Sequence, residues 1–271
     1  MLKMTDREFD QLAGFIKSNY GIKLYKEKKP LAVGRLSNVL LRLNLKSFSQ
    51  YYDYVISDKT GEAANELVNR ITTNHTFFMR EKEHFFYLRD EILPNLSKTL
   101  KDKDIRIWSA GCSTGEEPYT IAMIMDEYFQ EEKIFWDTKI LATDISEKVL
   151  GIARKGEYSN EKISALPANW RLHYFNKVNM GKSILIDKIR NDVIYRRFNL
   201  AEETFPFKKK FHIIFCRNVM IYFDDHARKS LIQKFYNITE PGGFLFIGHS
   251  ESISREDIKY KYIMPAVYRK E

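Results

Sequence analysis

A chain of 271 residues, 44% of them hydrophobic and 14% aromatic, can bury the core of one large domain or of one large and one small domain. It has no apolar run of about 18 residues, which excludes a membrane span. Its two cysteines, Cys112 and Cys216, are too few for a disulfide framework. The net charge of +8 predicts an acidic partner without choosing among nucleic acid, an anionic membrane and a protein surface. The polar start without a signal-peptide stretch predicts a cytoplasmic protein.

Residues 1–72 have the pattern of an all-helical domain. Thr5-Asp6-Arg7-Glu8 is a capping box that predicts the start of a first helix. Pro30 opens a second helix and Ser47 a third, each with apolar residues at helical spacing. Residues 62–71 predict a further helix, which we interpret as a linker to the next domain.

From about residue 100 the pattern alternates between strands and helices, which predicts a parallel sheet with helices on both faces. The expected strands are 105–109, 139–143, 211–216, 243–248 and 262–268, and the expected helices are 116–129, 146–154 and 225–238. Two β-rich runs, 183–189 and 192–198, meet at Arg190-Asn191 and predict a small antiparallel insert over about 182–199.

Polar residues follow three of the expected strands, at the edge of the sheet where ligands bind. Gly111–Glu117 is a glycine-rich turn into a helix, and its acidic side chains argue against a phosphate and for a ligand with hydroxyls or positive charge. Asp144 is placed to accept a ribose hydroxyl, although it could instead cap the helix that begins near Ser146. The long spacing and the absence of GxGxxG favour a methyl-donor nucleotide over a dinucleotide.

Several long motifs resemble those of the CheR-type chemotaxis receptor methyltransferases. They are TTNHTFFMRE (72–81), WSAGCSTGEEPYTIAM (108–123), ATDIS (142–146), FNLAEE (198–203), FCRNVMIYF (215–223) and GGFLFIGHSES (242–252). The resemblance implies a Rossmann-like class I methyltransferase domain of α/β class over 73–271. It implies S-adenosyl-L-methionine as donor, S-adenosyl-L-homocysteine as product and no metal. The acceptors would be glutamate side chains on the acidic signalling helices of transmembrane chemoreceptors, which would become methyl esters.

The same resemblance assigns roles to individual residues. The donor-binding positions would be Asn74, Thr76, Arg80, Glu117, Asp144, Asn199, Leu200, Arg217 and Asn218. Arg80 and Tyr222 would be catalytic, orienting the acceptor carboxylate more than activating it. Simpler roles stay open: Arg80 pairing with Glu81 or Glu83, Tyr222 as a half-buried core residue, and Arg217 pairing with an acidic neighbour. His249-Ser250-Glu251 would line the site or hold its shape.

The helical domain is basic, with eight Lys or Arg and one acidic residue, Glu27, between Lys17 and Lys46. Arg35, Arg42 and Lys46 fall within an arc of about 40° on a helix with 100° per residue. We expect these three residues to bind the glutamate-rich receptor helices, with an affinity that weakens in salt.

Alternatives to receptor methylation differ in acceptor or in class. A related methyltransferase with another protein acceptor would show the same motifs. A nucleic-acid-binding protein would explain the positive charge, but no recognised binding motif supports it. A donor-binding sensor without catalysis would not need both Arg80 and Tyr222. We therefore expect a monomeric receptor methyltransferase that binds no nucleic acid and does not insert into the membrane.

Overall fold

The computed structural model describes residues 3–253 and 259–271 of the chain. The chain divides into two compact units, one formed by 1–74 together with 222–228 and the other by 75–221 together with 229–271. The first unit thus ends two residues beyond the expected boundary and includes a segment that no sequence pattern assigned to it. Within 3–253 and 259–271, no helix combines the length and the apolar character needed to cross a membrane.

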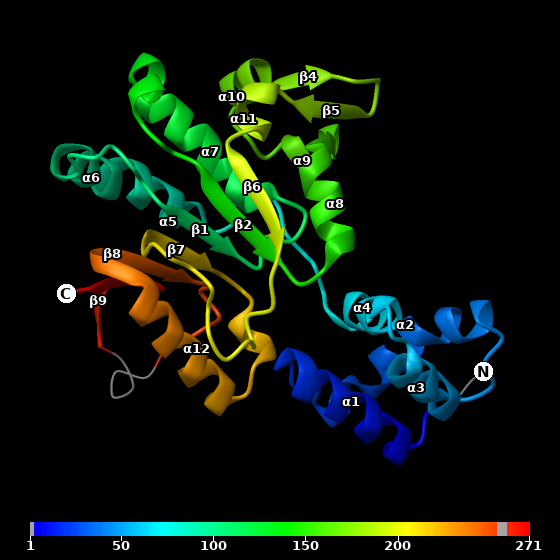
Figure 1. Ribbon diagram of the computed structural model, residues 1–271. Helices are drawn as coiled ribbons and strands as arrows, with labels where there is room; N and C mark the ends of the chain where they lie inside the picture. Colours follow the sequence, from blue (N-terminus) through cyan, green and yellow to red (C-terminus); the bar gives the residue numbers. More distant parts are fainter. Residues whose placement is uncertain (1–2, 254–258) are drawn as a thin grey trace. The chain divides into compact units, whose positions relative to one another are not determined.

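Four α-helices form the N-terminal part of the first unit, drawn blue to cyan in Figure 1. They are α1 Asp6–Tyr20, α2 Lys29–Arg42, α3 Phe48–Ser57 and α4 Glu62–Ile71, with a 3-10 turn at Lys26–Lys28. The capping box is present: the Thr5 hydroxyl accepts from the Glu8 amide at 3.2 Å, and Glu8 accepts from the Thr5 amide at 2.8 Å. The other Glu8 oxygen accepts from the amide of Ser49 at 2.9 Å, so one carboxylate ties α1 to the start of α3.

The interpretation of 62–71 as a linker is wrong. Helix α4 belongs to the first unit and packs against α2 and α3. Its hydrophobic residues recur every three or four positions, so that Leu67 and Val68 are buried along one face. The segment 222–228 completes this unit: the amide of Lys23 donates to the Tyr222 carbonyl at 2.7 Å.

The second unit contains a seven-stranded sheet in the order β6-β2-β1-β7-β8-β10-β9. The strands are β1 Ile107–Ala110, β2 Ile140–Asp144, β6 Val193–Arg197, β7 Phe211–Cys216, β8 Thr239–Ile247, β9 Tyr260–Met264 and β10 Val267–Lys270. The strands from β6 to β8 run parallel, and β10 and β9 are antiparallel to their neighbours. The single strand expected at 262–268 is therefore two strands joined by a turn.

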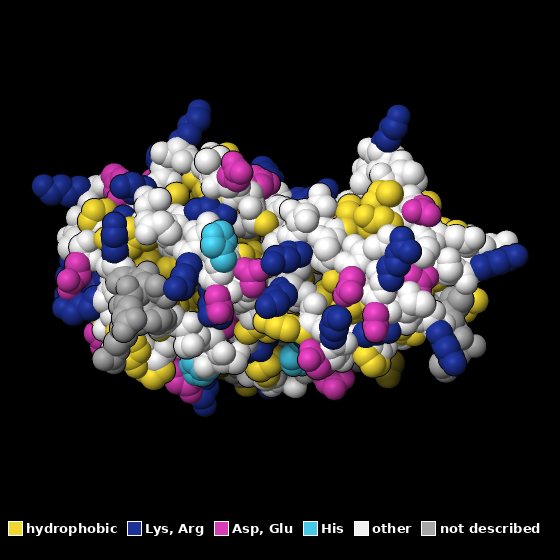
Figure 2. Space-filling view, turned by 90° about the horizontal axis from the view of Figure 1, so that it is seen from below, with side chains coloured by type: hydrophobic (Ala, Val, Ile, Leu, Met, Phe, Trp, Pro, Cys, Tyr) yellow, Lys and Arg dark blue, Asp and Glu magenta, His cyan; other side chains and the backbone are white. Residues whose placement is uncertain are grey.

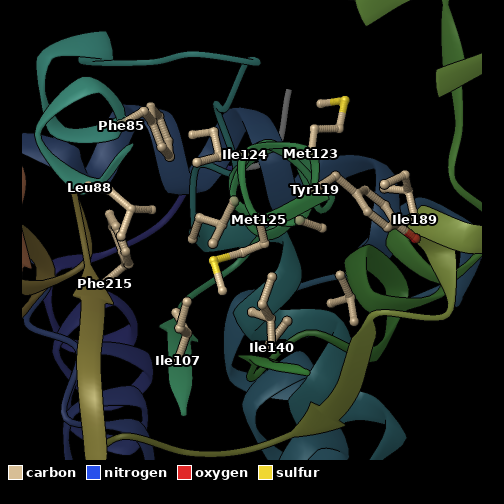
Figure 3. Close-up of a cluster of buried hydrophobic side chains, with 14 of the residues drawn as sticks. Phe85, Leu88, Ile107, Tyr119, Met123, Ile124, Met125, Ile140, Ile189 and Phe215 are labelled. Carbon is tan, nitrogen blue, oxygen red and sulfur yellow. The ribbon is translucent and has the colours of Figure 1, made fainter. Parts of the chain in front are cut away.

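Helices cover both faces of this sheet, as predicted. Consecutive residues of β1 point to opposite faces. Ile107 belongs to the core shared with α7 Glu116–Phe129, where Figure 3 shows it among buried side chains such as Met125 and Phe215. Trp108 packs on the other face, 5.4 Å by ring centroid from Phe235 of α12 Asp225–Ile238. The other helices are α5 Lys82–Tyr87, α6 Leu93–Thr99, α8 Glu147–Lys155, α9 Asn160–Ile163, α10 Ala168–Tyr174 and α11 Asp187–Arg190, with a π-helical turn at Leu88–Ile92 and 3-10 turns at Gln130–Phe135 and Met220–Tyr222.

The expected antiparallel insert over 182–199 is misplaced. A small antiparallel sheet does exist, but it has the order β3-β5-β4, with β3 Glu157–Ser159, β4 Phe175–Lys177 and β5 Lys182–Leu185. The second β-rich run became β6, a parallel edge strand on β2 of the main sheet. Alternating apolar residues predict a strand but not its partner. Arg190 is the last residue of α11 and Asn191 is its C-cap, so they do not form a hairpin turn.

Candidate functional site

The turn after β1 brings backbone close to a neighbouring loop. Gly111 has φ +84°, and a Cβ at this position would lie 2.4 Å from Cγ2 of Val219. Gly115, at φ +95°, directly precedes α7. The amide of Gly111 donates to the carbonyl of Thr143 at 2.8 Å, which holds the turn against the end of β2. The glycines are required here because the backbone is left-handed and the space is already filled.

Asp144 braces this turn from the end of β2. Its carboxylate accepts from the amide of Ser113 at 2.9 Å and from the amide of Ser146 at 2.9 Å. The N-cap of α8 is Ser146 itself, whose hydroxyl accepts from the Val149 amide at 3.3 Å, so Asp144 is not the cap. Burial raises the pKa of Asp144, and the amide hydrogen bonds act in the opposite direction.

Glu117 lies in the first turn of α7 and faces the end of β7. Its carboxylate accepts from the hydroxyl of Ser109 at 2.7 Å and from Nη1 of Arg217 at 3.0 Å. Burial raises the pKa of Glu117, although the charge of Arg217 lowers it. A carboxylate held in this way has fixed oxygen positions beside the glycine turn.

Arg217 follows β7 and is almost completely buried, with 2% of its side chain exposed. Its guanidinium pairs with Glu117 and, at 3.0 Å, with Glu81, and it also donates to the carbonyl of Arg80. One flat face lies over the ring of Phe85 at 5.1 Å. The interpretation that Arg217 pairs with acidic neighbours is confirmed, and these pairings bring the ends of β1 and β7 to the 80–81 segment.

Arg80 is held from two sides. Its guanidinium donates to the carbonyl of His75 at 2.8 Å and to Oδ1 of Asn218 at 2.8 Å. Asn218 has φ +59°, a left-handed conformation that non-glycine residues rarely adopt. Among the residues that the structure describes, the Arg80 guanidinium bonds to His75 and Asn218, and it forms no ion pair with Glu81 or Glu83.

The last residue of the His249-Ser250-Glu251 run holds the shape of the neighbouring loop. The Glu251 carboxylate accepts from the amides of Gly248 at 2.5 Å, Asn218 at 2.9 Å and Ile221 at 3.2 Å. Burial raises the pKa of Glu251, against the effect of these amides. Glu251 thus fixes the backbone of Asn218, whereas the His249 side chain is exposed.

The remaining candidates fall in different places. Thr76 is half-buried in the segment that precedes Arg80. Asn199 and Leu200 follow β6: Asn199 accepts from the Ala201 amide at 3.0 Å, and the Leu200 carbonyl accepts from Lys234 at 3.0 Å. These contacts shape the loop after β6.

Asn74 and Tyr222 belong to the first unit. Tyr222 is half-buried, and its hydroxyl donates to the carbonyl of Thr73 at 3.1 Å. Lys28 lies over its ring at 5.8 Å. Among the expected site residues, the strand ends of the second unit thus gather Arg80, Glu117, Asp144, Arg217 and Asn218.

The basic residues expected to bind receptor also lie in the first unit, with different surroundings. Nη1 of Arg35 donates to the carbonyl of Ile71 at 2.8 Å and to those of Arg70 and Thr72, at the end of α4. Arg42 pairs with Glu66 at 2.5 Å. Lys46 is exposed.

Sequence reasoning missed Ser109 and gave Glu81 no role beyond a possible partner of Arg80. Ser109 is the one polar residue of the buried strand β1, and that position was a usable signal. Glu81 is the last residue of the motif at 72–81, but its partners Arg217 and His249 are distant in the sequence.

A parallel sheet with a glycine turn after its first strand and a carboxylate at the end of the second is the arrangement of nucleotide-binding α/β domains. The site fits S-adenosylmethionine, because the carboxylates of Glu117 and Asp144 at the strand ends suit a ligand that carries hydroxyls and positive charge. Residues 74–268 match the family described as CheR methyltransferase, SAM binding domain. Residues 7–72 match the CheR methyltransferase, all-alpha domain.

Relatives match the chain over nearly its whole length. The chemotaxis protein methyltransferase of Borreliella burgdorferi is 42% identical, covering 99% of this chain and 96% of its own. The probable chemotaxis protein methyltransferase of Rhizobium etli is 39% identical, with 89% and 91% covered. Among solved structures, the chain is similar to an S-adenosylmethionine dependent methyltransferase from Mesorhizobium loti. The alignment covers 57% of this chain and 51% of that one, with 18% identity and a TM-score of 0.30. The chain belongs to the CheR methyltransferase family and is a SAM-dependent methyltransferase.

Proposed function

We propose that this protein methylates glutamate side chains on the signalling helices of chemoreceptors, forming glutamyl methyl esters. The observation that carries the proposal is that relatives named chemotaxis protein methyltransferase match both units, the helical one included. The acceptor helices would lie in the cytoplasm, where we place the protein as a monomer that binds no nucleic acid.

The chemistry asks for orientation rather than proton transfer. A glutamate side chain has an unperturbed pKa of about 4.3, so at neutral pH it is already the nucleophile and needs no general base. S-adenosylmethionine supplies an electrophilic methyl group when it is bound. Alignment of the two reactants alone can contribute about 7–11 kcal/mol to lowering the barrier. The protein's own task is to hold both partners in line.

The second unit offers the side chains that would hold the donor. Asp144 would accept the ribose hydroxyls, and Glu117 would face the positive end of the donor. We also assign Asn74, Thr76, Asn199, Leu200 and the pair Arg217-Asn218 to this site. Arg217 and Asn218 would act by fixing their neighbours, since their side chains are already engaged with Glu117, Glu81 and Arg80.

Arg80 and Tyr222 would orient the acceptor carboxylate. Two nitrogens of the Arg80 guanidinium donate hydrogen bonds to His75 and Asn218, and these bonds fix the plane of the guanidinium. Tyr222→Phe should lower turnover on receptor fragments and leave donor affinity unchanged. Equal turnover and equal receptor affinity in the two proteins would remove Tyr222 from this role.

The basic residues of the first unit would steer the acidic receptor helices. Lys26, Lys28 and Lys46 are exposed, whereas the Arg35 guanidinium is engaged with carbonyl groups. We propose that Arg35, Arg42 and Lys46 recognise the receptor helices, and substituting each residue separately would show which of them contributes. On the face drawn in Figure 2, Lys and Arg side chains are interspersed with Asp and Glu.

The deciding experiment incubates the protein with tritiated S-adenosylmethionine and receptor signalling fragments, then adds base and measures volatile methanol. Carboxyl methyl esters release methanol in base, whereas methylated nitrogen in protein or nucleic acid does not. Lys46→Glu should slow methylation at low salt, and Lys59→Glu, which changes another exposed lysine outside the basic run, is the matched control. Label that resists base would contradict the proposal.

A further inference from the structure

Glu81 joins three separate segments of the second unit. It stands directly after Arg80 with φ +55°, and 13% of its side chain is exposed. One oxygen accepts from Nε and Nη2 of Arg217 at 3.2 and 3.0 Å. The other accepts from Nδ2 of Asn218 at 3.3 Å and from the amide of His249 at 3.2 Å. Both carboxylate oxygens are therefore occupied by donors from the loops after β7 and β8.

These contacts decide which way the Asn218 amide points. An ionised carboxylate only accepts hydrogen bonds, so it selects the NH2 end of the amide. The oxygen end is then left to accept from Arg80, at 2.8 Å. Burial alone raises the pKa of Glu81, but the charge of Arg217 and the hydrogen bonds outweigh it, and the pKa lies below its ordinary value. The group that fixes the amide is thus charged at neutral pH.

We propose that Glu81 is a positioning residue that fixes the Arg80 guanidinium through the amide of Asn218. This inference rests on the proposed role of Arg80 in holding the donor and the acceptor. If the Asn218 amide turned over, its NH2 group would face the guanidinium and the 2.8 Å hydrogen bond would be lost. Glu81 would then affect the reaction without touching either substrate.

A metal ion is the competing explanation of the same residues. Glu81, His84 and His249 place their ligand atoms within 4.8 Å of one another. A dication bound there would compete with Arg217 for the carboxylate, and Arg217 also pairs with Glu117. Because the Glu81 carboxylate is already neutralised by Arg217, the positioning role is favoured over a metal site.

The test is a double-mutant cycle on the full chain, read as affinity for S-adenosylhomocysteine by calorimetry. Glu81→Gln keeps the volume but presents an amide that can turn its NH2 toward Asn218. We expect about a tenfold weaker affinity, and about a threefold or smaller effect when Arg80→Ala is already present. Glu83→Gln removes a charge from an exposed site two residues further on, in the first turn of α5, and should change nothing. Glu81→Ala is the second variant if Glu81→Gln unfolds.

Kinetics on receptor fragments separate positioning from general damage. Glu81→Gln should lower kcat and leave the KM for receptor unchanged. Equal effects of Glu81→Gln with and without Arg80 would overturn the inference, as would a loss of affinity on adding EDTA that zinc restores. Wild-type protein that binds S-adenosylhomocysteine but makes no base-labile ester would instead refute the proposed acceptor, while the binding cycle would still decide the role of Glu81.

Discussion

Replacing Arg217 by Met tests the charge balance of the candidate site. The substitution keeps much of the side-chain volume but removes the guanidinium that pairs with both Glu81 and Glu117, at 3.0 Å each. Two carboxylates, each with 13% of its side chain exposed, would then lose the cation that they share. Breaking a buried ion pair by removing one partner costs about 3–5 kcal/mol. Because one guanidinium pairs with two carboxylates here, we expect the free energy of unfolding to fall by about 4 kcal/mol. This is a large part of the roughly 5–15 kcal/mol by which folded domains are stable.

The assay is urea unfolding of the full chain at several pH values. Burial already raises the pKa of Glu117 above its ordinary value, and removal of Arg217 takes away the charge that opposes this shift. A carboxyl with a raised pKa in the folded state favours folding at low pH and loses that contribution as pH rises. The free energy of unfolding of Arg217→Met should therefore fall further below that of wild type at pH 7 than at pH 4.5.

A matched pair of variants completes this test. Arg217→Met with Glu117→Gln removes one of the unpaired charges and should recover part of the loss at pH 7. Arg217→Lys keeps the charge but not the planar fork, and it should fall between wild type and Arg217→Met. A loss below about 1 kcal/mol, or a deficit that does not depend on pH, would refute the reasoning.

Gly111→Ala should destabilise the protein and weaken S-adenosylhomocysteine binding, because its Cβ would lie 2.4 Å from Val219 at φ +84°; Gly14→Ala, with nothing within 4 Å, is the control in thermal unfolding. His84→Leu should flatten the pH dependence of stability: burial lowers the pKa of His84 to about 4 from 6.5, so wild type loses about 3 kcal/mol as pH falls from 6.5 to 4. If the free energies of unfolding of the two proteins, measured in urea, changed equally with pH, this expectation would be wrong. Arg35→Ala should lower the free energy of unfolding in urea by about 1–2 kcal/mol, because it removes the hydrogen bonds to the last carbonyls of α4. Lys46→Ala, at an exposed site, should cause no measurable change. Equal stability of the two variants would show that the cap is unimportant.

Local signals predicted many elements well. The helix at 116–129, the strand at 211–216 and the helix at 225–238 have the bounds found in the structure. Each combines a clear apolar period with a turn at its start. The parallel sheet followed from their alternation, and with it the meeting of Asp144, Glu117 and Arg217 at one edge.

Properties that depend on distant partners could not be predicted. The run at 192–198 has the pattern of a strand in either sheet, and only its pairing with β2 places it. The role of Glu81 depends on Arg217, which is 136 residues away in the sequence. Arg35 looked like a surface charge because no pattern marks a side chain that will reach the carbonyls at the end of α4.

The first unit is not one continuous stretch of chain, and this affects how it can be studied. Phe223 is buried, Ile22 forms a β-bridge with it, and Lys17 pairs with Asp224 at 2.8 Å. A truncated protein ending at Asn74 would lack these partners and would leave Ile22 uncovered. Pull-down experiments with such a fragment would measure a damaged surface, so receptor recognition is better dissected by point substitutions in the intact polypeptide.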